Sequence, residues 1–141
     1  MENEIFSHQN HPECKVENAL SVHSLITFFN CIRPADFSFK GEAHDFAEAV
    51  CVLNGKSGVT ADKNTFLLSA GEMILHPPGE FHAIWSDSGI ESELLIFSFR
   101  STGIPMPSGR VFKIPPEQIV ELRAVFRQAQ KAFVFNEIFV K

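Results

Sequence analysis

The sequence predicts a mainly β domain that ends in one α-helix. Short apolar segments rich in β-branched and aromatic residues recur about every 8–12 residues, which is typical of an antiparallel sandwich or barrel. Asn54-Gly55, between two such segments, is the dipeptide most typical of a tight hairpin. Beyond residue 115 the apolar residues instead step by three and four, which is the spacing of one helix face.

Strands are expected along most of the chain before residue 101. Residues 19–31 are β-branched and aromatic and predict one or two strands. Turn residues such as Pro34, Asp62-Lys63 and Pro77-Pro78-Gly79 separate the segments that follow. Those later strands are predicted at residues 36–39, 46–53, 56–61, 64–68, 73–76, 82–86 and 91–100.

The composition changes after the last predicted strand. Residues 102–114 are rich in Pro and Gly and predict a linker. Pro115 and Pro116 suit the first turn of a helix, where the missing N–H has no intrahelical partner to lose. The apolar face of this helix comprises Ile119, Leu122, Phe126, Ala129 and Phe133. Two interpretations of that face are open: the helix packs on its own barrel, or it dimerises with a second copy.

The predicted organisation therefore has four parts. A polar N-terminal arm occupies residues 1–18, and a β-barrel occupies residues 19–101. The Pro/Gly linker at 102–114 leads to a C-terminal helical dimerisation segment at 115–141.

Composition limits the function classes. At 141 residues the chain has room for one domain, and its fifteen Phe without Tyr predict a Phe-lined core or cavity. A formal charge of −5 without a dense Lys/Arg cluster argues against direct nucleic-acid binding. The three cysteines lack Cys-x-x-Cys spacing, and no stretch approaches the roughly 20 apolar residues of a membrane span. A soluble, cytoplasmic protein is the expectation.

Two polar signatures carry the chemistry. They read Glu42-x-His44-x3-Glu48-x6-Gly55 and Gly71-x5-Pro77-x-Gly79-x2-His82. Alternation along a strand puts Glu42, His44 and Glu48 on one face, and His82 is expected to face His44 across a shared hollow. Two imidazoles with one or two carboxylates suit Zn, Ni, Fe or Mn. Without a metal, Glu48 is expected to pair with His44 or His82, and Glu42 is either a ligand or a solvated rim residue.

These signatures resemble the two motifs of the cupin superfamily, His-x-His-x3-Glu-x6-Gly and Gly-x5-Pro-x-Gly-x2-His. The second motif is matched in full, whereas Glu42 replaces the leading His of the first. The resemblance implies a double-stranded β-helix, also called a jelly-roll barrel. The metal site of cupins normally takes three imidazoles and one carboxylate. Glu42 departs from that ligand set, so the resemblance implies a divalent metal only as an optional cofactor.

Finer features narrow the resemblance. Residues 44–48, 52–55, 66–72, 77–82 and 96–99 look like the N-terminal effector-binding domain of AraC-type transcription regulators, and the likeness covers about residues 20–135. It implies a small-molecule effector, a homodimer and no catalysis. Regulators of this type continue into a helix-turn-helix domain, which is missing from this chain, so contact with DNA is expected only through that part.

An effector of this kind is expected to occupy a mainly apolar pocket with few polar anchors. The residues expected to line it are Phe46, Phe66, His76, Trp85 and Phe97. Arg33 and Arg100 are candidates to hold a carboxylate only if they face inward. The alternative function is a stand-alone cupin metalloenzyme of the dioxygenase or isomerase type, with its metal on His44, Glu48 and His82.

Overall fold

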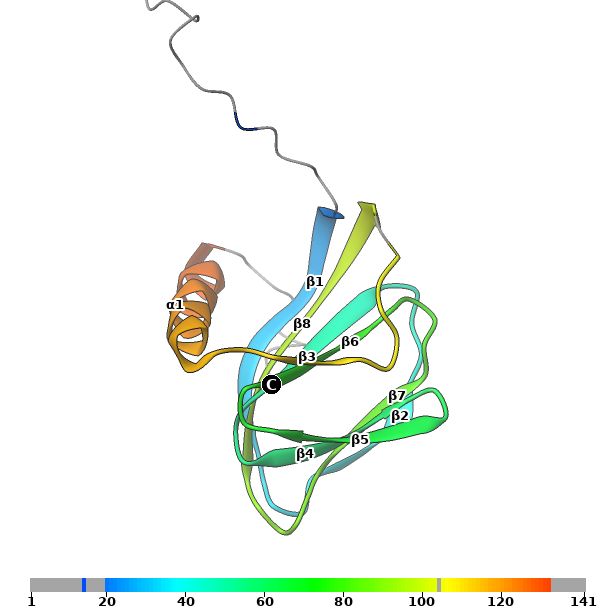
Figure 1. Cartoon of the computed structure of the whole chain (residues 1–141), viewed down its shortest axis with the longest axis vertical. Helices are drawn as coiled ribbons and strands as arrows, with labels where there is room; N and C mark the ends of the chain where they lie inside the picture. Colours follow the sequence, from blue (N-terminus) through cyan, green and yellow to red (C-terminus); the bar gives the residue numbers. More distant parts are fainter. Residues whose placement is uncertain (1–13, 15–19, 104, 133–141) are drawn as a thin grey trace, which may run out of the picture.

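The computed structural model describes residues 14, 20–103 and 105–132, and most of them form two antiparallel sheets (Figure 1). One sheet has five strands in the order β1-β8-β3-β6-β9, and the other has four in the order β2-β7-β4-β5. The elements are β1 (Leu20–Arg33), β2 (Ser38–Glu42), β3 (Ala47–Asn54), β4 (Lys56–Ala61), β5 (Asn64–Ser69), β6 (Glu72–His76), β7 (His82–Ser86), β8 (Ser92–Gly103), β9 (Val111–Lys113) and α1 (Pro116–Ala132). The prediction of a mainly β fold with a C-terminal helix is confirmed.

The segment expected as one or two strands forms one long strand, β1, with register shifts between Val22 and Ser24 and between Leu25 and Thr27. One feature of the sheets differs from the sequence-based expectation. The segment expected as a linker at 102–114 contains β9, which pairs with β6. A strand this short depends on its partner rather than on its own composition, so a pattern search does not find it.

The two sheets enclose the main core. Alternation turns one face of each strand inward, so buried apolar side chains come from both sheets. These side chains are Val50, Val52, Ile74, Leu94 and Ile96 from the five-stranded sheet, and Val59, Ala61 and Leu68 from the four-stranded sheet. Toward the start of β3, Glu48 continues the same inward face. The polar site described below therefore begins where this core ends.

Helix α1 packs on the outer face of the five-stranded sheet, beside β1 (Figure 1). Phe126 is only 3% exposed, and its ring stacks on that of Phe28 with the centroids 3.9 Å apart. Ile119 and Leu122 pack against the same outer cluster, which includes Leu95. Burying a side chain such as Phe126 contributes about 2–3 kcal/mol. Of the two interpretations of this helix face, packing on its own barrel is the one observed for these residues.

Other expectations for the two ends of the chain lie outside the described residues. They concern the polar arm at 1–18, apart from Cys14, and the end of the helical segment at 133–141, which includes Phe133. Within the described ranges, no helix is long and apolar enough to cross a membrane.

Candidate functional site

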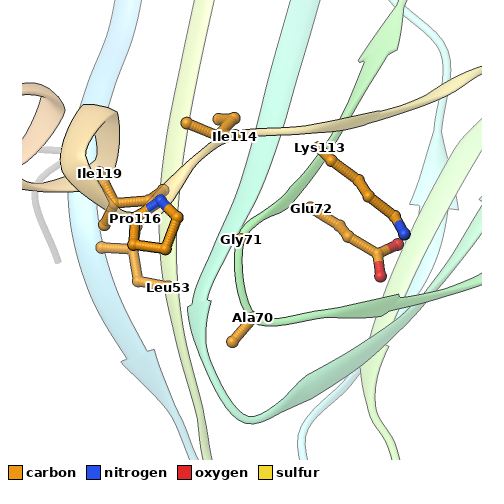
Figure 2. Close-up of a pocket in the computed structure, with 8 residues that line it drawn as sticks. All are labelled: Leu53, Ala70, Gly71, Glu72, Lys113, Ile114, Pro116 and Ile119. Carbon is orange, nitrogen blue, oxygen red and sulfur yellow. The ribbon is translucent and has the colours of Figure 1, made fainter.

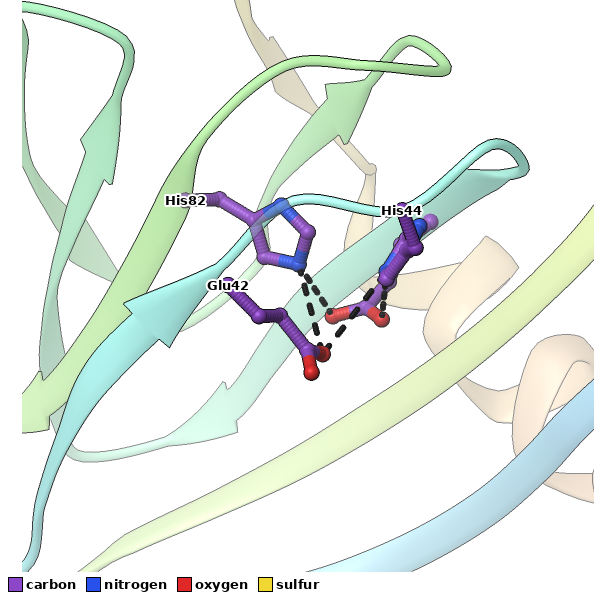
Figure 3. Close-up of side chains that lie close together, drawn as sticks. Glu42, His44 and His82 are labelled. Carbon is purple, nitrogen blue, oxygen red and sulfur yellow. Dashed lines mark hydrogen bonds and ion pairs between the residues drawn. The ribbon is translucent and has the colours of Figure 1, made fainter.

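Four side chains of metal-ligand type meet inside the barrel (Figure 3). They are Glu42 at the end of β2, His44 in the following loop, Glu48 in β3 and His82 at the start of β7. One ligand atom from each lies within 4.8 Å of the others. We call these four residues the His/Glu cluster. His44 and His82 do face a shared hollow, with their ring centroids 4.8 Å apart.

Backbone pairing explains why the two signatures converge. Glu42 and His82 are direct partners in the β2–β7 ladder, which has a register shift after Phe39. The N–H of Gly79 donates to the carbonyl oxygen of His44 at 2.7 Å, so the turn of the second signature is bonded to the first. Gly79 has a φ of 83°, a conformation that L side chains rarely adopt, and the turn therefore favours glycine.

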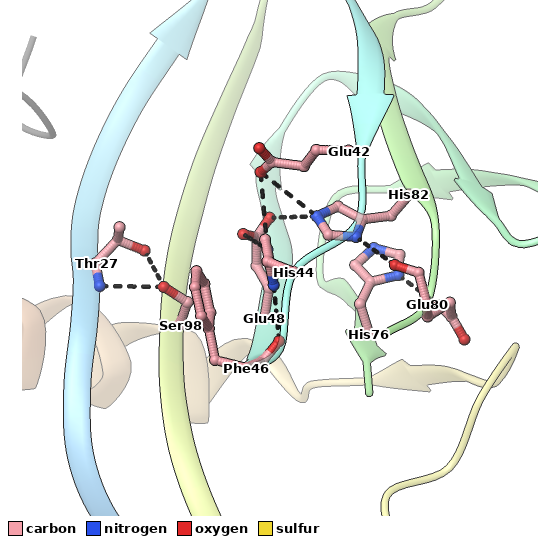
Figure 4. A network of polar contacts seen from close by, with 9 residues as sticks. All are labelled: Thr27, Glu42, His44, Phe46, Glu48, His76, Glu80, His82 and Ser98. Atoms are coloured by element: carbon pink, nitrogen blue, oxygen red, sulfur yellow. Dashed lines mark hydrogen bonds and ion pairs between the residues drawn. The ribbon is translucent and has the colours of Figure 1, made fainter. Parts of the chain in front are cut away.

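Hydrogen bonds to carbonyl groups set the tautomers of both imidazoles (Figure 4). Nδ1 of His44 donates to the Phe46 carbonyl at 2.8 Å, and Nδ1 of His82 donates to the Glu80 carbonyl at 3.1 Å. A carbonyl oxygen only accepts, so each Nδ1 carries a hydrogen and each Nε2 is turned toward the cluster. Nε2 of His44 lies 3.3 Å from Oε2 of Glu48, and Nε2 of His82 lies 3.6 Å from Oε1 of the same residue.

Glu48 and His82 favour each other's charged forms. Burial by itself would raise the pKa of Glu48, but its contact with His82 and the imidazole charges of His82 and His44 outweigh burial and lower that pKa. Burial by itself would lower the pKa of His82, but the carboxylate of Glu48 outweighs burial and raises it. The protein groups alone therefore favour a carboxylate on Glu48 beside an imidazolium on His82.

The same geometry fits a divalent metal ion. Nε2 of His82 is buried and has no hydrogen-bond partner among the described residues; the nearest oxygens of Glu48 and Glu42 are 3.6 and 3.8 Å away. A buried nitrogen without a partner, facing carboxylates, is satisfied by a cation placed between them. The hydrogen bonds from Nδ1 of both imidazoles to backbone carbonyl oxygens resemble those that orient metal-bound histidines in proteins. Glu42, half exposed, would supply an oxygen at the open side.

A second polar layer lies behind the cluster. The ring of His76 stacks on that of His82 with the centroids 4.5 Å apart, and its Nδ1 lies 2.8 Å from Oε1 of Glu80. Ser108 donates to the other oxygen of Glu80. Burial lowers the pKa of His76, and Glu80 offsets this only in part. Glu80 and Ser108 were not among the predicted site residues, although a His and a Glu four residues apart across a Pro-Pro-Gly turn are a usable signal.

A cavity of about 470 Å³ opens beside the His/Glu cluster. Strands β1, β2, β3, β7 and β8 and the loops at the two ends of β2 contribute its walls. Its lining residues are Thr27, Phe29, Arg33, Phe37, Phe39, Glu42, His44, Phe46, Glu48, Ile84 and Ile96. Phenylalanine and isoleucine provide the apolar walls, and the cluster provides polar groups. This combination is typical of a small-molecule site.

Four of the five residues expected to line an effector pocket do not line this cavity. Phe46 lines it, and its ring stacks on His44 at 3.8 Å. His76 is buried behind His82, and Phe66 faces inward but packs against the main apolar core. Trp85 and Phe97 point to the outer faces of the two sheets.

The outward direction of Trp85 follows from strand alternation. Its neighbour Ile84 faces the cavity, so Trp85 faces out. There it is paired with Gly58 of β4, and the indole lies so close that a Cβ on Gly58 would be 2.1 Å from Cε2 of Trp85.

Phe97 is turned outward in the same way, because Ile96 and Ser98 occupy the inner face of β8. Its ring lies 5.8 Å from that of Phe126 in helix α1. Arg33 faces the cavity, whereas Arg100 is exposed and pairs with Asp45 at 2.9 Å.

Another cavity, of about 440 Å³, lies between the barrel and the start of helix α1 (Figure 2). Its lining residues are Leu53, Ala70, Gly71, Glu72, Lys113, Ile114, Pro116 and Ile119. Its charged residues are one Glu and one Lys, and its walls contain no imidazole or thiol. The cavity beside the His/Glu cluster is therefore the better candidate for a functional site.

Comparisons with known proteins agree with this architecture. A comparison with curated proteins finds no match. Among solved structures, the chain is similar to a predicted oxalate decarboxylase from Thermotoga maritima, at 19% identity and a TM-score of 0.52, over 54% of this chain and 67% of that one. It is also similar to a conserved protein of unknown function from Streptococcus pyogenes, at 16% identity and a TM-score of 0.50, over 74% of this chain and 100% of that one.

A third similar structure is the protein TT1209 from Thermus thermophilus, at 17% identity and a TM-score of 0.50, over 55% of this chain and 82% of that one. At these identities the likeness supports the fold alone. The family model for the AraC-like ligand binding domain matches residues 32–104, which include both signatures and most of the cavity. The chain has a cupin fold and belongs to the AraC-like ligand-binding domain family.

Proposed function

We propose that this domain binds a small-molecule effector in the cavity beside the His/Glu cluster and acts as the sensing part of an AraC-type transcription regulator. The observation that carries this proposal is a phenylalanine-lined cavity of about 470 Å³ with three residues of the His/Glu cluster in its wall and the fourth, His82, beside them. The apolar walls supply contact area, and the cluster supplies orientation.

The described contacts also offer a route from the cavity to helix α1. Glu48 lines the cavity, and Leu53, on the same strand, belongs to the cluster on which Ile119 and Leu122 rest. A ligand that prefers one position of this strand would shift the helix population by its difference in affinity for the two positions.

A divalent metal on Glu42, His44, Glu48 and His82 is part of this proposal. The metal would supply a positive charge and a coordination position for an oxygen of the effector. Zn, Ni, Fe and Mn all accept this donor set. If both carboxylates, those of Glu42 and Glu48, are ligands, Fe or Mn is favoured.

A homodimer in the cytoplasm, reaching DNA through a helix-turn-helix part outside this chain, completes the proposal. Because Ile119, Leu122 and Phe126 are used against the chain's own barrel, the dimer contact would use another surface. The exposed side of the same helix, with Val120 and Val125, is the candidate.

The competing function is a cupin metalloenzyme, and one observation favours it: three of the candidate metal ligands open directly onto the cavity. A metal held there would be accessible to a substrate, whereas a purely structural metal site is closed.

Calorimetry on the purified chain, with and without added Mn²⁺, tests the proposal against a panel of sugars, phenols and aromatic acids. Saturable binding without consumption of the ligand is the expected result. Phe39→Ala, in the cavity wall, weakens binding, while Leu67→Ala, an exposed residue on the outer face of β5, serves as the matched control. Turnover of a bound compound by the metal-loaded chain favours the enzyme instead.

A further inference from the structure

Three buried polar atoms without a hydrogen-bond partner gather toward one end of the barrel. Among the described residues they are Nε of Arg33, Oγ of Ser92 and Oγ of Ser57. A fourth such atom, Nε2 of His82, belongs to the His/Glu cluster and has been explained there. Buried donors without acceptors are rare in folded proteins and call for an explanation.

The strand register places these three residues together. Arg33 at the end of β1 is the direct partner of Ser92 at the start of β8. Ser57 shares the inward face of β4 with Val59 and Ala61 of the main core. The preceding turn touches β8, because a Cβ on Gly55 would lie 3.0 Å from Cα of Ser92. The starts of β4 and β8 and the end of β1 therefore close this end of the barrel.

Arg33 is a cation with no counter-ion in the described part of the protein. The Arg and Lys ion pairs found there use Arg100 and Arg123. The guanidinium of Arg33 instead lies over the ring of Phe37, 4.5 Å from its centroid, and lines the cavity. The positive charge of this guanidinium therefore faces the cavity.

The opposite end of the same cavity has the opposite charge. Glu48 lies level with Thr27 in the five-stranded sheet, because both are register partners of Ser98. Thr27 and Arg33 are six positions apart on β1, about 20 Å along an extended strand. Phe29 and Ile96 line the cavity between them. The cavity is thus cationic at the Arg33 end, apolar in the middle and acidic at the other end.

We infer that the ligand of this cavity is an apolar monocarboxylic acid whose carboxylate binds at Arg33. Two N–H groups of the Arg33 guanidinium match the two oxygens of a carboxylate in a bidentate arrangement. A carboxylate held there also brings negative charge toward the buried Nε–H and the hydroxyls of Ser57 and Ser92, which have no hydrogen-bond partner among the described residues. The apolar body packs on Phe29, Phe39 and their neighbours. In the metal-free protein a second acidic group is disfavoured, because it would face Glu42 and Glu48. This inference rests on the proposed effector-binding function and names its ligand class.

Matched acid and amide pairs test the inference by calorimetry at about pH 7. The probes are benzoate, hexanoate and 3-phenylpropanoate, each with its primary amide, which keeps the size and the apolar body and removes the charge. The acids are expected to bind about 10- to 100-fold more tightly than the amides, the range for a hydrogen bond to a charged group. Arg33→Gln removes this preference. Arg110→Gln keeps it, because Arg110 also lies over a phenylalanine ring but outside the cavity.

Ser92→Ala is a second control. Ser92 is the register partner of Arg33, but its hydroxyl is buried and Ser92 is not among the residues that line the cavity, so this variant is expected to keep the preference for acids. Amides that bind as tightly as their acids, or an acid preference that survives Arg33→Gln, overturn the inference and leave the proposed function standing. Failure of every acid, amide, sugar and phenol to bind overturns both.

Discussion

Nδ1 of His76 and Oε1 of Glu80 lie 2.8 Å apart in the protein interior, directly behind the ring of His82. Burial lowers the pKa of His76 and so favours the neutral imidazole, whose Nδ1–H faces the carboxylate of Glu80. Glu80 also accepts from Ser108, in the segment that leads to helix α1. The buried carboxylate of Glu80 thus bonds both to His76, behind the His/Glu cluster, and to Ser108, in the segment between β8 and helix α1.

Glu80→Ala is expected to lower the free energy of unfolding by about 1–3 kcal/mol, because it leaves the buried Nδ1–H of His76 without an acceptor. Urea denaturation measures the change. Ser108→Ala removes one donor and leaves the pair with His76 intact, so a smaller loss of about 1 kcal/mol is expected. Equal losses for the two variants would contradict the central position given to Glu80.

Divalent cations are expected to raise the melting temperature of the purified chain if the His/Glu cluster holds a metal. At about 100 times the dissociation constant, binding adds about 2.7 kcal/mol to the stability. Thermal shift with Zn²⁺, Ni²⁺ and Mn²⁺ is the measurement. His44→Ala and His82→Ala abolish the shift, whereas His23→Ala, an exposed histidine bonded to Thr102, retains it. A shift that persists in His82→Ala places the metal elsewhere.

Phe126→Ala is expected to lower the free energy of unfolding by about 3–5 kcal/mol, because it removes the buried ring that stacks on Phe28. The adjacent residue Val125 is 55% exposed, and Val125→Ala should change the stability by less than about 0.5 kcal/mol. Both values come from denaturation at two protein concentrations. A loss for Phe126→Ala that depends on concentration would indicate a contact between copies rather than with the chain's own barrel.

The ion pair between Arg123 of helix α1 and Glu93 of β8 makes the docking of the helix depend on pH. The hydrogen bond from Arg123 lowers the pKa of Glu93 below its ordinary value of 4.5. The pair therefore stabilises the fold above pH 4.5, and this contribution is lost as the pH falls through the lowered pKa of the folded state. Its size is about 0.5–1 kcal/mol, since the pair is partly exposed.

Hydrogen exchange of α1 amides at about pH 6 and about pH 3 follows this effect. Protection of the helix should fall at the lower pH, and Glu93→Gln should remove much of the difference. Asp45→Asn serves as the control, because Asp45 also pairs with an arginine but lies on the surface away from the helix. A pH response of the helix that is unaltered in Glu93→Gln rules this explanation out.

Strand positions and the His/Glu cluster were predictable because both depend on local spacing. The strands Lys56–Ala61 and His82–Ser86 have the predicted bounds. Glu48 and His82 come together because alternation along each strand turns both side chains inward. The glycine turns mark where one strand ends and the alternation begins again in the next. Strand β9 was not predictable, since it exists only through its pairing with β6.

The residues that line the cavity were harder to predict from the sequence than the strands. Trp85 and Phe97 each lie next to an isoleucine that faces inward, and a shift of one residue decides between the cavity and the outside. The prediction for these two residues rested on their aromatic type and not on the side of the strand that each occupies. The role of Arg33 depended on the same choice of face, which the sequence leaves open.

Strand β3 has hydrogen-bonded neighbours on both sides, β6 and β8, and is buried along almost all of its length. Glu48 near its start faces the cavity, and Leu53 near its other end supports helix α1. The two lie about 17 Å apart at an extended rise per residue. Because β3 is hydrogen-bonded along both edges, we expect it to move as a unit, so a ligand that displaces Glu48 would also displace Leu53 beneath the helix.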